Sequence, residues 1–201
     1  MKNFLKLVFF LSLSVFSFIM IILISVDGYD DPYYLRFTTS KKSSMILGDS
    51  RSAQGIRPDI LNDILNRNDI YNYSFTNTHS PFGEIYVQSI KKKLDHSTTN
   101  GVFILNVTPY SISNKIKTNN SNTNNLRELN SFLKDTPVNK SPNFFYLLKY
   151  FSQKYYKILF RNESIFLHDD GWLEITIPLD SVSVFQRTNR KIDRKNDTGS
   201  N

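Results

Sequence analysis

The residues best suited to chemistry form the motif Gly48-Asp49-Ser50, which directly follows the short apolar run 44–47. If this run is the first strand of a parallel sheet, the Ser50 hydroxyl projects from the carboxyl end of the sheet, where α/β domains bind their ligands. Ser50 is then a candidate nucleophile, because backbone N–H groups at the start of the next helix could hold an oxyanion. The alternative is structural, since Asp and Ser are also favoured helix N-caps.

A serine nucleophile needs a general base, and the three histidines are the first candidates. His79 lies in THSPFG, close to the presumed oxyanion loop, so its ring could reach the site or simply pack there. His96 follows a run of charged residues and is expected at the surface. His168 stands beside two aspartates, but the spacing differs from Asp-x-x-His. We therefore expect all three histidines to be structural.

Composition excludes several other kinds of site. The chain has no cysteine, which rules out disulfides, cysteine-ligated metals and a cysteine nucleophile. The histidines lack His-x-x-x-His spacing, so a zinc site is not expected either. No metal or cofactor is predicted.

Three segments carry a resemblance to a known family. MILGDSRSAQGI resembles the first sequence block of the SGNH/GDSL hydrolases, particularly their membrane-anchored bacterial members. The similarity continues through SFTNTHSPFGEIY, which matches the second block, and through GVFILNVTPYSIS, which leads towards the third. It covers roughly residues 44 to 113.

The resemblance implies a role for five residues. Ser50 would be the nucleophile, with Gly48 and Asp49 supporting it, while Gly83 and Asn106 would contribute to the oxyanion hole. Two features depart from the family pattern. The setting of the asparagine is not Gly-x-Asn-Asp, and no Asp-x-x-His block supplies a base.

The resemblance therefore implies a hydrolase or O-acyltransferase that acts on acyl esters of cell-surface carbohydrate and is catalytically incomplete in this chain. The pattern is that of an amino-terminal portion of a longer protein, or of a descendant that lost catalysis. The alternative function is a non-catalytic, membrane-anchored module that binds a glycan or a membrane acyltransferase partner.

The elements that would position this site alternate along the chain. Helical spacing at 58–67 and 83–94 is interleaved with strand patterns at 70–75 and 101–107, the last a continuous apolar run typical of a strand buried on both faces. This order predicts an α/β domain with a parallel sheet. The resemblance specifies a three-layer, flavodoxin-like SGNH sheet over 44–180, incomplete at its end.

Beyond residue 109 the pattern loosens. The Asn-rich stretch 114–125 is predicted to be an exposed loop and 126–134 a short helix. Ser141-Pro142 predicts the start of a helix that runs to about Phe160. A turn at Asp170-Gly171 should lead into a strand.

The N-terminus predicts a membrane anchor. Residues 7–26 contain no charge, Pro or Gly, and a helix of this length spans the ~30 Å hydrocarbon layer. Lys2 and Lys6 precede it and acidic residues follow it, so 1–6 should be cytoplasmic and the bulk of the chain extracytoplasmic, in the periplasm. A cleaved signal peptide is the alternative, but no Ala-x-Ala-like site is visible.

Two segments flank the predicted domain. Residues 27–43 are expected to be a juxtamembrane linker and 181–201 a basic polar tail. The net charge of +7 could suit nucleic acid or anionic lipid. No aromatic nucleic-acid motif accompanies the basic residues, so a solvated tail is favoured and nucleic acid is not expected as a partner.

Overall fold

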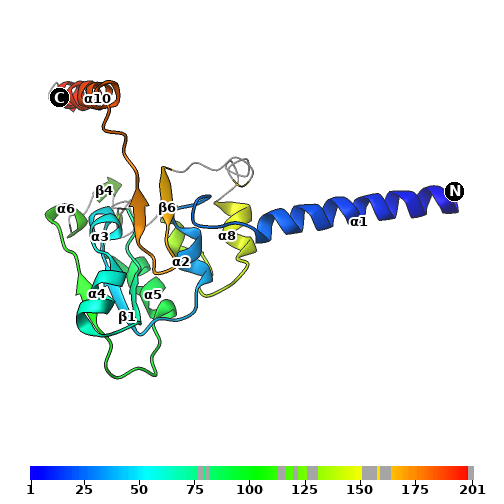
Figure 1. Ribbon diagram of the computed structural model, residues 1–201, viewed down its shortest axis with the longest axis horizontal. Coiled ribbons are helices and arrows are strands. Elements are labelled where there is room, and N and C mark those ends of the chain that lie inside the picture. Colours follow the sequence, from blue (N-terminus) through cyan, green and yellow to red (C-terminus); the bar gives the residue numbers. More distant parts are fainter. Residues whose placement is uncertain are drawn as a thin grey trace.

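The computed structural model describes residues 1–76, 79, 82–112, 116–119, 122–125, 131–150, 158 and 164–198. The protein is a mixed α/β protein with one long N-terminal helix (Figure 1). The helices are α1 Lys2–Ile24, α2 Tyr34–Thr38, α3 Ser50–Gly55, α4 Pro58–Leu65, α5 Glu84–Lys93, α6 Pro109–Ile112, the 3₁₀ turn η1 Phe132–Lys134, α8 Phe144–Lys149 and α10 Ser181–Thr198. The strands are β1 Ser44–Leu47, β2 Ile70–Asn72, β3 Phe103–Leu105, β4 Ile116–Asn119, β5 Asn122–Asn125, β6 Ile165–Leu167 and β7 Leu173–Ile175.

The central sheet is small and parallel. Its strand order is β2-β1-β3, with Met45 of β1 opposite Tyr71 of β2 and Phe103 of β3. The predicted alternation of strands and helices is thus confirmed from β1 to β3. Parallel pairing brings the carboxyl ends of all three strands to one edge, which is where the Gly-Asp-Ser motif lies.

Helices contact both faces of this sheet. The Asn72 amide donates to the carbonyls of Ser52 and Ile56, at α3 and just beyond it. The next residue, Tyr73, turns to the other face, where its hydroxyl bonds to Ser89 of α5 at 2.7 Å. Successive side chains of an extended chain point to opposite faces, so α3 and α5 lie on opposite sides.

The core on the α5 side is built from aromatic rings. Phe37, Phe75, Tyr86, Phe132 and Tyr146 are all buried there and pack mainly edge-on or tilted. Such offset ring contacts add to the free energy gained from burial alone. They join α2, α5, η1 and α8 to the sheet.

Strand β3 differs from the prediction that it is buried on both faces. Phe103 and Leu105 are 47% and 60% exposed. The prediction was wrong because Phe103 and Leu105, two residues apart, share one face of the strand, and the described part of the chain leaves that face partly uncovered. A continuous apolar run cannot reveal whether neighbouring elements cover both faces of a strand.

Two later segments also depart from expectation. Strands β4 and β5 pair antiparallel as a hairpin where an exposed loop was predicted for 114–125. Of the helix predicted at 126–134, η1 is described and 126–130 lie outside the described residues. Of the helix predicted from Pro142 to about Phe160, α8 ends at Lys149, and 151–157 also lie outside the described residues.

The hairpin of β6 and β7 covers the end of β2. The predicted turn at Asp170-Gly171 and the strand after it are confirmed. The Asp170 carbonyl accepts from the Asn72 N–H at 2.8 Å, and the Trp172 indole donates to the Gln54 carbonyl at 2.8 Å. These contacts tie the hairpin to β2 and α3.

Both flanking segments contain helices. Helix α1 is long and apolar enough to cross a membrane. Residues 27–43, expected as a linker, include α2 and bury Tyr34, Arg36 and Phe37 in the domain. Residues 181–198 of the expected basic tail form α10, which stands apart from the rest of the domain (Figure 1).

Candidate functional site at the carboxyl edge of the sheet

Gly48 forms the turn that ends β1. Its backbone has a φ of +152°, which residues with side chains rarely adopt. A Cβ at this position would lie 2.5 Å from the Ser52 Oγ and 2.9 Å from the Asn106 carbonyl oxygen. The Gly48 carbonyl accepts from the Phe75 N–H at 3.1 Å, so the turn is also joined to the chain leaving β2.

Asp49 links this turn to the chain that leaves β3. Its side chain is almost fully buried and accepts from the backbone N–H of Arg51 at 2.9 Å, which makes Asp49 the N-cap of α3. The same carboxylate accepts longer hydrogen bonds, both of 3.3 Å, from the Asn106 amide and the Thr108 hydroxyl. The structural interpretation of Asp49 as a cap is therefore correct.

Ser50 is the first residue of α3 and is half-buried. Within the part of the chain that the structure describes, no hydrogen-bond partner contacts its hydroxyl. The resemblance assigns Asn106 to the oxyanion hole that would serve Ser50. In the structure, the Asn106 amide contacts the carboxylate of Asp49, the residue before Ser50. The structure therefore brings Gly48, Asp49 and Asn106 together around the turn that carries Ser50.

The start of α5 belongs to the same edge of the sheet. Gly83 is its N-cap. One turn further on, the Tyr86 hydroxyl accepts from the Gly48 N–H at 3.2 Å and donates to the Tyr73 carbonyl at 2.7 Å. Burial raises the pKa of the Tyr86 hydroxyl, which therefore stays protonated and able to donate. This bond directs the first turns of α5 towards the end of β1.

All three histidines make contacts of their own. The His79 ring packs on Phe132, with ring centroids 4.2 Å apart, and burial lowers its pKa to about 4. His96 is exposed beside the Lys91 carbonyl. His168 bonds to the Glu174 carboxylate at 2.9 Å within the β6–β7 hairpin. His79 is therefore uncharged at neutral pH and a weak base.

Sequence reasoning missed two residues of this edge. Thr108 reaches the Asp49 carboxylate, and Tyr86 holds the Gly48 N–H. A signal existed for Thr108, since it follows Asn106 by two residues and therefore shares its side of an extended chain. For Tyr86 the only signal was its place one helical turn after Gly83.

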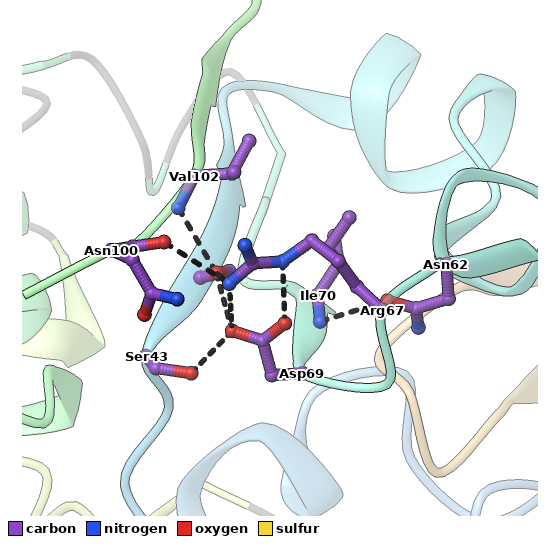
Figure 2. Close-up of polar contacts among 8 residues, drawn as sticks. Ser43, Asn62, Arg67, Asp69, Ile70, Asn100 and Val102 are labelled. Atoms are coloured by element: carbon purple, nitrogen blue, oxygen red, sulfur yellow. Dashed lines mark hydrogen bonds and ion pairs between the residues drawn. The ribbon is translucent and has the colours of Figure 1, made fainter. Parts of the chain in front are cut away.

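The opposite, amino edge of the sheet carries a polar network that the sequence did not indicate (Figure 2). Arg67 and Asp69 form a two-point ion pair, with N···O distances of 2.7 and 2.8 Å. The Asp69 carboxylate also accepts from the hydroxyls of Ser43 and Ser44 at 2.5 and 2.6 Å. These donors hold the pKa of Asp69 well below its usual range.

The network in Figure 2 joins the beginnings of all three strands. Arg67 donates to the Asn100 carbonyl before β3, and the Ser44 hydroxyl of β1 accepts from the Val102 N–H. The side chain of Asn62 in α4 accepts from the Ile70 N–H at the start of β2. Because these bonds join the beginnings of β1, β2 and β3 to one another, we assign the network a role in stability.

Among the described residues, no cluster of His, Asp or Glu could hold a metal ion. No protein-family model, curated protein or solved structure matches the chain. The class that the fold and the site define is a mixed α/β domain on a membrane-compatible helix, with its candidate site where the parallel strands end.

Proposed function

We propose that this chain is a single-pass, membrane-anchored SGNH-like domain whose bulk lies in the periplasm. Its site is built for acyl transfer on esters of cell-surface carbohydrate but is catalytically incomplete. In the complete reaction the Ser50 Oγ attacks the ester carbonyl carbon, its proton passes to a base, and the alcohol leaves as the C–O bond breaks. Water then releases the acyl group from the serine.

One observation carries this proposal: a half-buried serine hydroxyl with no partner among the described residues follows the central strand of a parallel sheet. The backbone N–H groups of Ser50 and Gly83 are the groups that would stabilise an oxyanion there. Helices on both faces of the sheet agree with the three-layer arrangement of the SGNH fold. Incompleteness is supported by the separate contacts of the three histidines.

The first test measures hydrolysis of p-nitrophenyl acetate by the full chain in phospholipid nanodiscs. We expect equal turnover by the wild type and Ser50→Ala, because a serine without a base is a poor nucleophile. The control is Ser97→Ala, which removes an exposed serine hydroxyl. Turnover abolished by Ser50→Ala and retained by Ser97→Ala would show that the chain is a complete enzyme.

A second test supplies the base from solution. With added imidazole, the wild type should hydrolyse the ester faster than Ser50→Ala in the same buffer, because imidazole can take the Ser50 proton. A difference of about tenfold or more is expected, since general-base catalysis typically contributes at least that much. Equal rates for the two proteins at every imidazole concentration would refute acyl transfer at Ser50.

The second candidate function is the non-catalytic module that binds a glycan or a membrane acyltransferase partner. It is favoured by the hydrogen bonds of Asp49, which engage the Arg51 N–H, the Asn106 amide and the Thr108 hydroxyl in structural contacts. Titration with acetylated oligosaccharides distinguishes the two functions. Binding that survives Ser50→Ala, without imidazole rescue, supports the module.

A further inference from the structure

The C-terminal end of α1 and the residues just after it pack into the domain. Leu23 and Val26 are buried in the same core cluster as Tyr146 and Leu147 of α8. Helix α8 therefore lies beside the C-terminal end of α1 (Figure 1). If α1 spans a membrane, this packing sets the depth of α8 relative to the bilayer.

Helix α8 has one face that the described part of the domain leaves largely uncovered. It begins after Asn143, whose side chain accepts from the Tyr146 N–H at 3.2 Å. Tyr146 and Leu147 point into the core, whereas Phe145 and Leu148 are exposed, the latter by 67%. The exposed pair consists of large apolar side chains.

Leu148 lies at the level of the acyl chains if α1 spans the bilayer. It lines an apolar pocket of about 290 Å³ together with Ile19, Ile22 and Leu23. With α1 ending at Ile24 and a rise of 1.5 Å per residue, Ile19 lies about 7.5 Å below that end. The pocket is therefore on the hydrocarbon side of the interface.

The end of α8 carries groups that suit the lipid headgroups. The Lys149 ammonium lies 5.2 and 5.3 Å from the ring centroids of Phe145 and Tyr150, and it pairs with Asp135 at 3.1 Å. Lysine and tyrosine are typical of the membrane–water boundary, where an apolar stem or ring lies in lipid and the polar end in water.

We propose that α8 inserts Phe145 and Leu148 into the leaflet in which α1 ends, so that lipid acyl chains cover this face. The lipid bilayer is thus a second contact of the domain, separate from the span of α1. This inference does not depend on chemistry at Ser50.

The chain contains no cysteine, so a single introduced cysteine can be labelled specifically. Leu148→Cys, and separately Phe145→Cys, is labelled with bimane, and the full chain is reconstituted in phosphatidylcholine vesicles. Nitroxides placed at a shallow acyl-chain position should more than halve the emission of either label. The matched control is Ile64→Cys on α4, where the native side chain is 72% exposed. Its label should not be quenched.

Two outcomes would overturn the proposal. First, bimane at positions 145 and 148 could emit at the same wavelength as bimane at position 64 and be equally unquenched. That result would place this face in water. A blue-shifted emission without nitroxide quenching would mean that protein, such as α1 of a second copy, covers the face instead. Unchanged Trp172 emission in each variant would verify that the domain remains folded.

Discussion

At Gly48 the chain leaves β1 with a φ of +152°, and the space for a Cβ is already occupied by Ser52 and Asn106. The same residue bonds to the chain leaving β2 through its carbonyl and to Tyr86 through its N–H. A glycine is therefore required by conformation and by close packing at once. Gly48 thereby sets the conformation of the turn that positions Asp49 and Ser50 at the start of α3.

Replacing Gly48 by Ala should lower the free energy of unfolding by about 3 kcal/mol, because it adds both backbone strain and overpacking. The measurement is urea unfolding of the detergent-solubilised chain, followed by Trp172 fluorescence. The control is Gly55→Ala, where a Cβ meets nothing within 4 Å. That change should be neutral or stabilise by up to about 1 kcal/mol, and equal losses for both variants would contradict our account of Gly48.

His79 predicts a pH dependence whose sign follows from its burial. Its pKa of about 4 in the folded chain lies below the ordinary value of 6.5, so the unfolded chain binds the proton more readily. The resulting stability is complete above pH 6.5 and is lost as the pH falls towards 4. His79→Phe keeps a ring against Phe132 and should unfold with a weaker acid dependence than the wild type.

The difference between the two unfolding curves, measured from pH 7 to pH 4, isolates this residue from the carboxylates. His96→Phe is the control, because His96 is exposed, and its curve should run parallel to that of the wild type. A His79→Phe curve that also runs parallel to the wild type would mean that His79 is accessible to protons in the folded state.

Among the elements, the three parallel strands are held at both ends, but by different means. At the carboxyl edge, Asp49 joins β1 to the segment after β3. At the amino edge, the Arg67–Asp69 pair and its serine partners join all three strands (Figure 2). A sheet of only three strands has few ladder hydrogen bonds, so such side-chain ties contribute a large share of its order.

Asp69→Asn should cost about 2 kcal/mol, because it leaves the partly buried Arg67 without its charged partner. The chain offers a matched control in Arg57–Asp59, which has the same i, i+2 spacing. The side chains of that pair are 45% and 49% exposed, against 20% and 24% for Arg67–Asp69. Asp59→Asn should leave stability almost unchanged, as is usual for surface pairs. Thermal unfolding of both variants tests the difference.

The elements that could be predicted from sequence are those marked by their own residues. Pro58 begins α4, Gly48 ends β1 and Gly171 forms the turn before β7. The β4–β5 hairpin was missed because its Asn-rich residues have low intrinsic strand preference. The exposure of β3 was missed because burial depends on neighbours that the sequence does not locate. Gly48 and Asp49 were indicated by the motif itself and Asn106 by the resemblance, and the three lie together in the structure, whereas Tyr86 acts through a long-range contact.

At the scale of the whole molecule, the C-terminal end of α1 packs against the domain. Leu23 and Val26 are buried with the domain core, and residues 27–43 continue that packing through α2. The full chain, rather than a chain beginning after α1, is therefore the proper material for every assay.

Leu23→Ala should lower the free energy of unfolding of the domain by about 3 kcal/mol, because it removes a buried aliphatic side chain. Phe9→Ala lies in the same helix but is exposed, so it should leave domain unfolding unchanged. Denaturation in one detergent, monitored by Trp172 emission, compares the two variants. Indistinguishable stabilities would mean that α1 and the domain fold independently.

If α1 spans a membrane, the buried junction also bears on how long the domain stays there. A protease that releases a membrane protein needs an accessible, extended stretch of several residues next to the lipid. Here Val26, Asp30 and Asp31 are buried, and the Asp30 N–H donates to the Asp27 carbonyl. Cleavage at the junction would first require local unfolding, so we expect the folded chain to resist proteolytic separation of the domain from α1.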